Sequence, residues 1–305
     1  MTDLPSTLVV KNLCKKIGRK EIIKNLSFEL KEGEVFGFLG PNGSGKTTTV
    51  RMLVGLIKPT SGEVHIYGHH LQKDFIKAID NIGCIVENPE LYPYLTGWEN
   101  LQQFARMVPG IKKARLKEVV DLVGLQNRIH DTVKTYSLGM RQRLGIAQAL
   151  LGKPKVLILD EPTNGLDPGG IREMREFIRT LAERDKISIL VSSHLLSEIQ
   201  LMCDRVAIIS KGQIIKIDSV EHLLAAQERV WWTLDPVAEG KQIISKTMTI
   251  FSEKEGVIVT NYDEKNIASV NETLVRKGVR VHGIEVKLPT LEDLFIELTG
   301  GETID

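Results

Sequence analysis

Hydrophobic and polar residues alternate along two early stretches of the chain, residues 8–12 and 22–30. Successive side chains of a β-strand point to opposite faces, so this alternation predicts strands with one buried face. Residues 34–39 (EVFGFL) form a short apolar run typical of a buried strand, and residues 63–67 (EVHIY), followed by Gly68, predict another strand and a turn. We therefore expect an antiparallel β-layer beside a buried strand.

Short apolar runs then alternate with segments of helical spacing. Buried strands are predicted at 82–86, 156–159 and 188–192. Helices are predicted at 98–124, with a break near Pro109-Gly110, and at 171–184. Strands that alternate with helices are typical of an α/β fold with a parallel sheet.

The pattern changes after about Leu224. The predicted order is then strands at 229–235, 246–251 and 256–260, a helix at 267–277, a strand at 279–286 and a helix at 291–298. This order is typical of a small α+β unit, and it carries no catalytic pattern of its own. We predict two domains, residues 7–225 and residues 226–305.

Composition narrows the possible classes of protein. A length of 305 residues suits one large domain or one domain with an appendage, and a net charge of +1 gives no bulk attraction to nucleic acid. Cys14, Cys84 and Cys203 are far apart and lack metal-ligand spacing, so neither a disulfide framework nor a zinc site is expected. The sequence shows no signal peptide, and no apolar run approaches the roughly 20 residues that cross a bilayer. We expect a soluble cytoplasmic protein whose role at a membrane would need a separate partner.

The segment after the strand at 34–39 is rich in glycine and fits G-x-x-x-x-G-K-[ST], the phosphate-binding P-loop. Backbone amides and the N-terminus of the following helix favour an anion, Lys46 can reach the β- and γ-phosphates, and the Thr47 hydroxyl can bind Mg²⁺. The alternative is a glycine-rich turn with a structural role only, but every constrained position matches in a strand–loop–helix context. We predict an ATP site made by Gly40, Pro41, Asn42, Gly43, Ser44, Gly45, Lys46, Thr47 and Thr48.

Two acidic residues follow the apolar run at 156–159. Asp160 is expected at the tip of the strand, where it can hold Mg²⁺ directly or through water, and Glu161 is expected to face the same site. Adjacent carboxylates can divide the work, one binding the metal and one polarising water against the γ-phosphate. Such a pair could also be a solvated acidic turn, but beside a P-loop we interpret it as a catalytic site.

Further motifs follow in a set order. Ser137 opens the segment YSLGMRQR, where by itself it predicts only a helix cap. The run 164–167 (NGLD) follows the acidic pair, and His194 follows the apolar strand at 188–192. A lone histidine is more often a structural or surface residue. In this order, however, the motifs resemble those of the ATP-binding subunits of ABC transporters, over about residues 7–225.

The resemblance implies a P-loop NTPase fold of the ABC type, with a parallel core sheet, an antiparallel β-layer and a helical subdomain, here followed by the α+β appendage. It implies that Glu161 is the catalytic glutamate and that His194 contacts the γ-phosphate. Two such domains would pair head to tail, with ATP between the P-loop of one and Ser137 and Gly139 of the other. Asp167 would carry contacts across the pair.

Three places depart from the family pattern. Glu87 stands where a loop usually begins with glutamine; a carboxylate there can still bind Mg²⁺ or water, so the expected metal ligands are Thr47, Asp160 and Glu87. Leu138 and Met140 replace a glycine and the glutamine of the usual signature. Ile17 occupies a place where an aromatic residue often stacks on adenine, which weakens the expected contact with the base.

The leading hypothesis is an enzyme that hydrolyses ATP to drive a separate integral membrane permease. The departures and the ending LPTLEDLFIELTG resemble the exporter group for bacitracin and lantibiotics, which implies export of an antibiotic or antimicrobial peptide. The expected partners are the permease and a second copy of the chain or a homologous ATPase, without nucleic acid. The expected location is the inner face of the cell membrane, as a peripheral protein.

Two alternatives stay open at this point. One is a non-transport ABC ATPase acting on DNA or ribosomes, although the sequence shows one cassette, no sustained heptads and no metal-type cysteine spacing. The other is a nucleotide-dependent regulator that hydrolyses ATP poorly, which Glu87 and the altered signature leave open. Measured turnover separates the regulator from the leading hypothesis.

Overall fold

The computed structural model describes residues 5–87, 89–225, 228–254, 256–287, 290–292 and 294–295. They divide into two compact units, the first reaching Asp218 and the second beginning at Ser219. This division falls slightly before the predicted boundary at 225/226, and the assignment of two domains stays a prediction. The predicted last helix, 291–298, lies half outside the described residues, and its described positions, 291–292 and 294–295, are helical.

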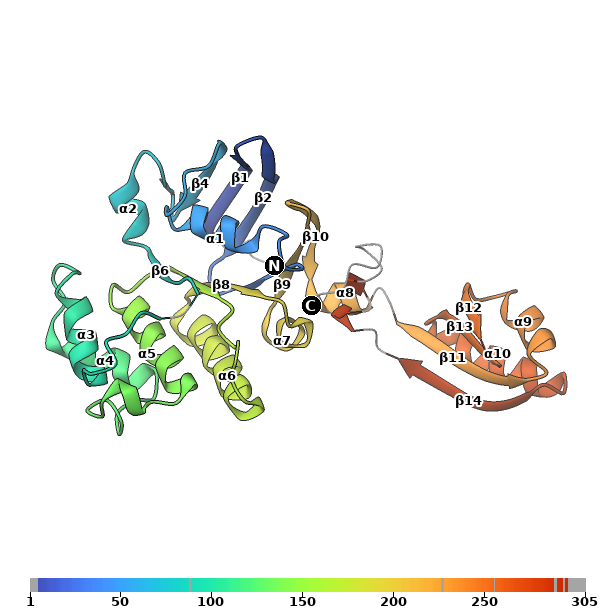
Figure 1. Ribbon diagram of the computed structural model, residues 1–305. Helices are drawn as coiled ribbons and strands as arrows, with labels where there is room; N and C mark the ends of the chain where they lie inside the picture. The colour runs from blue at the N-terminus through green and yellow to red at the C-terminus, as the bar shows by residue number, and fades with distance from the viewer. Residues whose placement is uncertain are drawn as a thin grey trace. The chain divides into compact units, whose positions relative to one another are not determined.

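A six-stranded sheet forms the centre of the first unit (Figure 1). Its order is β10 (Gln213–Ser219), β9 (Arg205–Ser210), β3 (Val35–Leu39), β8 (Ser188–Ser193), β7 (Val156–Asp160) and β6 (Ile82–Ile85). The pairs from β6 through β7, β8 and β3 to β9 are parallel. Their carboxyl ends therefore meet at one edge, where the segments after β3, β7 and β8 come together.

A four-stranded antiparallel sheet completes the β-structure of this unit, in the order β2 (Lys20–Lys31), β1 (Ser6–Ile17), β4 (Ser61–Ile66) and β5 (His69–His70). Its inward side chains and those of β3 share one core. Within this core, the Phe28 ring stacks on that of Phe36 at 5.6 Å between centroids and lies 5.5 Å from that of Phe38. Burial of these apolar side chains fixes the register of the strands.

Helices lie beside the sheets of the first unit, and three of them pack together at one side of it (Figure 1). The helices of this unit are α1 (Lys46–Leu53), α2 (Phe75–Ile79), α3 (Gly97–Ala105), α4 (Lys113–Leu122), the 3₁₀ turn η1 (Val133–Thr135), α5 (Leu138–Leu150), α6 (Pro168–Asp185) and α7 (Leu196–Met202). The predicted break near Pro109-Gly110 separates α3 from α4. Among the described helices, none is long and apolar enough to cross a membrane.

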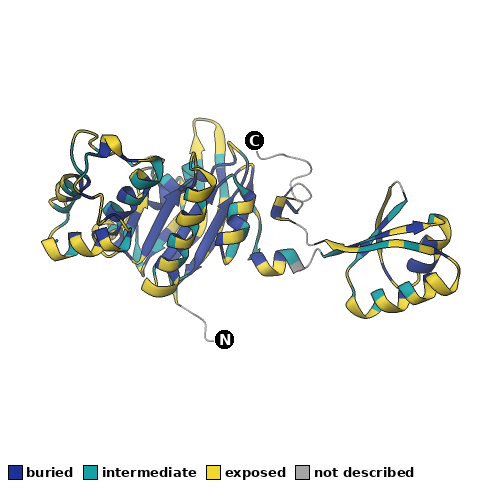
Figure 2. Ribbon diagram, turned by 90° about the horizontal axis from the view of Figure 1, so that it is seen from below, coloured by how far each residue is buried: buried dark blue, intermediate teal, exposed yellow. Residues whose placement is uncertain are grey.

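The second unit contains an antiparallel sheet in the order β12 (Ile250–Lys254), β13 (Val257–Asn261), β11 (Arg229–Asp235) and β14 (Arg280–Lys287). Its helices are α8 (Val220–Ala225), α9 (Val237–Ile244) and α10 (Glu264–Arg276). Figure 2 shows α9 and α10 against the sheet with their outer faces exposed. The fully buried indole of Trp232 lies in the core that the sheet forms with these two helices. This architecture matches the α+β appendage predicted from the sequence.

The predicted strand at 246–251 is wrong over most of its length. The chain forms a turn after α9, and β12 begins only at Ile250. Ile244 and Met248 are buried in the core beside Trp232. Because they are four residues apart, these apolar positions follow a helix and its last turn rather than the alternation of a strand.

Candidate functional site

The P-loop connects β3 to α1 in the conformation that its glycines require. Gly43 and Gly45 have φ angles of 78° and 107°, in the left-handed range that disfavours other residues. A Cβ on Gly45 would also lie 2.4 Å from Cδ1 of Ile23. Gly45 therefore admits no side chain, because the loop passes directly against β2.

Lys46 begins α1 and turns its ammonium back into the loop. Its Nζ donates to the carbonyl oxygens of Gly40, at 2.5 Å, and Pro41, at 3.3 Å. The residue is only 7% exposed. Burial lowers the pKa of Lys46, and the charges of Glu161 and Asp160 oppose part of that shift. A buried cation held by two carbonyls is well placed to exchange them for phosphate oxygens.

The ends of β7 and β8 hold two carboxylates and a histidine together. Asp160 is buried and accepts a hydrogen bond from the Ser192 hydroxyl. The Glu161 amide donates to the Ser192 carbonyl at 3.1 Å, and the Glu161 carboxylate lies 2.7 Å from Nδ1 of His194. Glu161 has a φ of 52°, unusual for a non-glycine residue. The fold thus orients one acid of the pair towards His194 and keeps the other buried beside Ser192.

These segments line one cavity of about 620 Å³. The lining residues are Ile22, Pro41, Asn42, Gly43, Gly45, Lys46, Thr47, Thr48, Glu161, Asn164 and His194. The cavity has a size suited to a small-molecule ligand, and its polar groups are those of the predicted phosphate site. Ile22 is the one apolar side chain in this lining that the sequence analysis did not single out.

Some predicted residues lie outside this lining. Gly40 bonds to Lys46 through its carbonyl, and the buried Ser44 hydroxyl has no hydrogen-bond partner among the described residues. The Glu87 carboxylate forms an ion pair with Arg51 and is largely exposed, so the described geometry does not bring it into the cavity. Its role as a metal ligand stays a prediction.

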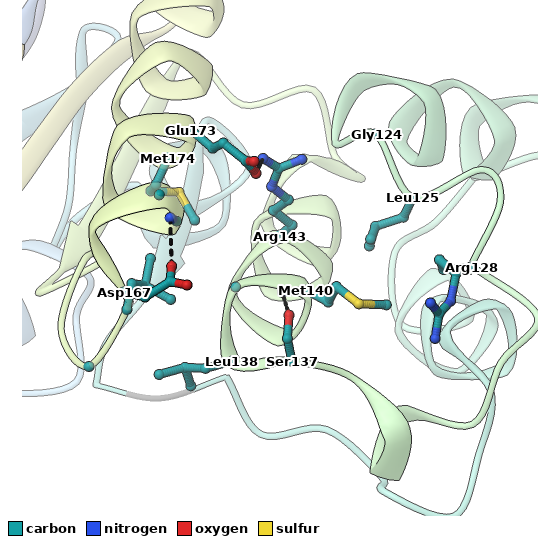
Figure 3. Close-up of a pocket in the computed structure, with 15 residues that line it drawn as sticks. Gly124, Leu125, Arg128, Ser137, Leu138, Met140, Arg143, Asp167, Glu173 and Met174 are labelled. Carbon is teal, nitrogen blue, oxygen red and sulfur yellow. Dashed lines mark hydrogen bonds and ion pairs between the residues drawn. The ribbon is translucent and has the colours of Figure 1, made fainter.

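The signature segment lines a second cavity of about 500 Å³, which shares no lining residue with the first. Ser137 caps α5, its hydroxyl accepting from the Met140 amide at 3.2 Å, and Asp167 caps α6 by accepting from Gly170 at 2.7 Å. Figure 3 shows Ser137, Met140 and Asp167 around this space. Two helix N-termini therefore open onto one cavity, an arrangement that favours an anion.

The family departures have definite places in this geometry. Leu138 lies against the 164–167 turn, since a Cβ on Gly165 would meet its Cδ2 at 3.0 Å. Leu138, Gly139 and Met140 all line the second cavity. Ile17 is 56% exposed at the end of β1. The substitution at position 138 thus adds an apolar contact between the start of α5 and this turn.

Comparison with known proteins agrees with this geometry. Residues 23–164 match the family model described as ABC transporter. The chain is 51% identical to the uncharacterized ABC transporter ATP-binding protein YhcH of Bacillus subtilis (strain 168) over 97% of each chain. The chain belongs to the ABC transporter ATP-binding proteins.

Two other relatives extend the comparison of this ABC protein. It is 41% identical to the bacitracin transport ATP-binding protein BcrA of Bacillus licheniformis, over 96% of this chain and 97% of the relative. A dimeric structure of the ATP-binding cassette MJ0796, in a post-hydrolysis state with ADP and Pi, is similar with a TM-score of 0.62 and 26% identity. That match covers 70% of this chain and 98% of the other.

The expectations on family, fold and enzyme class are confirmed. The chain has the ABC-type P-loop fold, binds ATP and is a transporter ATPase. The match to YhcH over 97% of both chains means that the relative shares most of the second unit as well. The roles of individual site residues stay predictions.

Proposed function

We propose that this chain hydrolyses ATP at the P-loop cavity to drive export of an antibiotic or antimicrobial peptide by a separate membrane permease. The observation that carries the hydrolytic part is that one cavity gathers Lys46, Thr47, Glu161 and His194. The relative named as a bacitracin transport ATP-binding protein, 41% identical over nearly its whole length, supports the cargo class.

The proposed chemistry assigns each side chain a separate task. Lys46 exchanges the Gly40 and Pro41 carbonyls for the β- and γ-phosphate oxygens of ATP. Glu161 orients and polarises the attacking water, and His194, held at 2.7 Å from its carboxylate, contacts the γ-phosphate with its other ring nitrogen. The pairing of Glu161 and His194 links the group that activates water to the group that senses phosphate.

The oxygen ligands at this edge of the sheet fit Mg²⁺. Thr47 lines the cavity, and Asp160 is the last residue of β7, directly before the cavity residue Glu161. Hydroxyl and carboxylate oxygens are the ligands that Mg²⁺ prefers, with phosphate oxygens completing the set. When bound, Mg²⁺ neutralises charge on the β- and γ-phosphates. Glu87 would have to leave Arg51 before it could join these ligands.

We further propose that two chains act head to tail, each completing the other's site. The signature cavity is lined by Ser137, Gly139 and the N-terminal end of α6 and is separate from the P-loop cavity. One chain therefore offers a phosphate-binding half and a capping half at different places. In the proposed pair, Ser137 of one chain faces the γ-phosphate bound by its partner, and Asp167 lies at the contact between them.

The Glu161→Gln variant tests the hydrolytic proposal. The amide keeps the shape of the side chain but cannot polarise water, so we expect ATP binding with turnover at least roughly 100-fold slower. The ATP-bound variant should elute as a dimer on size exclusion. Wild-type turnover in the variant would place the catalytic group elsewhere, and a wild-type chain as slow as the variant would favour the regulator.

The proposed contact with a permease lies on the 89–96 loop and is tested in a separate experiment. Tyr92 and Tyr94 are 42% and 72% exposed, and exposed aromatic side chains are favoured interface anchors. We expect co-purification with a permease from native membranes and a loss of it in the double variant Tyr92→Ala, Tyr94→Ala, with ATP binding unchanged. Undiminished co-purification would move the docking surface to another part of the chain.

A further inference from the structure

The hairpin of β4 and β5 carries a group of metal-binding side chains on one face. Val64 and Ile66 are fully buried under the antiparallel sheet. Because alternate side chains of a strand point to opposite faces, Glu63 and His65 share the outer face. Neither Glu63 nor His65 lines the P-loop cavity or the signature cavity.

The return strand brings a third side chain to the same place. Tyr67 and Gly68, with φ angles of 48° and 81°, form the tight connection that pairs His65 with His70. The two imidazole centroids are 4.9 Å apart. One potential ligand atom each from Glu63, His65 and His70 lie within 4.8 Å of one another, and the Glu63 carboxylate is 4.0 Å from Nε2 of His65.

The hydrogen bonding of the two rings leaves them able to bind an ion. Nδ1 of His65 is buried and has no hydrogen-bond partner in the described part of the chain. Nδ1 of His70 accepts from the Gln72 amide at 3.1 Å. A neutral imidazole has one nitrogen lone pair, so an ion at His70 must displace this amide, whichever nitrogen it takes. Gln72 is exposed, and water can replace the lost acceptor at little cost.

We propose that Glu63, His65 and His70 form a surface site for a divalent transition metal ion such as Zn²⁺, Co²⁺ or Ni²⁺. Two imidazoles and a carboxylate are typical ligands of these ions, whereas Mg²⁺ prefers oxygen alone. Zinc ligands at about 2.0–2.1 Å from the ion lie roughly 3.3 Å apart. The Glu63 and His65 atoms, 4.0 Å apart, must therefore approach by about 0.7 Å, and a pair at the 4.8 Å limit by about 1.5 Å. The exposed, flexible Glu63 side chain supplies most of that movement, and water fills the fourth position.

One neighbouring charge competes with the ion. Lys11 on β1 is the cross-strand partner of Glu63, so its ammonium can reach the same carboxylate. The site is therefore expected to bind more weakly than a buried structural zinc site. Binding would still connect β4 to β5 across the hairpin and oppose its separation.

The test is Co²⁺ or Zn²⁺ titration of the full chain with Mg²⁺ in excess to occupy the oxygen ligands of the P-loop. We expect one equivalent bound by the wild type. Changes outside the ligand shell typically lower metal affinity by roughly 10–100-fold. Because His65→Ala and His70→Ala each remove a ligand, we expect each variant to lower the affinity for the ion by more than that. His69→Ala is the matched control, because His69 pairs with Ile66 and lies on the other face of the same strand.

The variants also control for other sources of metal uptake and for misfolding. Cys14, Cys84 and Cys203 remain in every variant, so thiol binding would leave the same uptake in all of them. Circular dichroism checks folding, and His70→Gln repeats the test with a side chain of similar volume. Absence of binding by the wild type, retention in both His70 variants, or equal loss in His69→Ala would overturn the proposal.

Discussion

Ser192 holds Glu161, which lines the P-loop cavity, and the buried Asp160 beside it in place. Its hydroxyl donates to Asp160, while its carbonyl and hydroxyl oxygens both lie within hydrogen-bond distance of the Glu161 amide. A non-glycine residue with positive φ costs on the order of 1–3 kcal/mol, and these bonds keep Glu161 in that conformation. The sequence carried a signal for this role, since Ser192 and Ser193 are buried polar residues ending an otherwise apolar strand.

The charge of Lys46 leads to a prediction at the same scale. Lys46→Ala should weaken ATP binding by roughly 10–100-fold or more, because it removes charge-assisted hydrogen bonds worth about 1.5–3 kcal/mol. Nucleotide titration measures the change. Lys58→Ala, at an exposed position after α1, is the control and should leave affinity unchanged. Equal ATP affinity in the Lys46→Ala and Lys58→Ala variants would show that Lys46 does not bind the nucleotide.

Among the elements, the start of α3 is fixed against the segment before α5. The Thr96 hydroxyl and the Glu99 carboxylate form a reciprocal cap at the start of α3. The buried Tyr136 hydroxyl donates to the Arg128 carbonyl at 2.7 Å, and a Cβ on Gly97 would meet that hydroxyl oxygen at 2.4 Å. Only glycine therefore allows α3 to begin this close to Tyr136.

Tyr136 gives a prediction for alkaline stability. Burial, with the charge of Asp131, raises the pKa of Tyr136 from 10.0 to about 12. As pH rises, Tyr136 ionises in the unfolded chain before it ionises in the folded protein. Its neutral form therefore contributes fully to the stability of the folded protein below pH 10, and this contribution is lost as pH rises through 12. The two-unit difference corresponds to roughly 2–3 kcal/mol.

Urea unfolding from pH 8 to 12 measures this loss. Tyr136→Phe should be about 1 kcal/mol less stable near pH 8, because the Arg128 carbonyl loses its donor. Its stability should then fall less steeply above pH 10 than that of the wild type. Parallel curves for the two proteins would show that Tyr136 does not carry the alkaline loss.

The elements also show what could be predicted from the sequence. Apolar runs identified β3, β7 and β8 because these strands are buried at every position. The helix α7 was missed because it is short, and β10 was missed because none of its positions is fully buried, so it lacks a continuous apolar run. Strand β9 was missed as well, although its apolar run VAII was a signal in the sequence. The pairing of Arg51 with Glu87 was not predictable, because only the folded chain brings α1 and the segment after β6 together.

In the whole molecule, the two units have separate cores. All residues that line the P-loop cavity belong to the first unit, whereas the second has its own core around Trp232. In that core the Trp232 indole nitrogen donates to the Thr260 hydroxyl at 3.0 Å, and both residues are fully buried. Stability of the second unit should therefore change without a change at the nucleotide site.

Thr260→Val tests this separation. Valine keeps the shape of threonine but leaves the buried Trp232 donor unpaired, which costs roughly 1–3 kcal/mol. We expect a lower melting transition for the second unit in calorimetry, and nucleotide affinity equal to that of the wild type. A matching fall in nucleotide affinity would mean that the two units are energetically coupled.

The separation of the P-loop cavity from the signature cavity has a consequence for mixtures of defective chains. In the proposed head-to-tail pair, a chain disabled at Lys46 still offers an intact Ser137, and a chain disabled at Ser137 still offers an intact Lys46. When two such chains meet, both defects fall on one composite site, and the other site is whole. Two variants that are each inactive alone are therefore expected to form one working site when they are mixed.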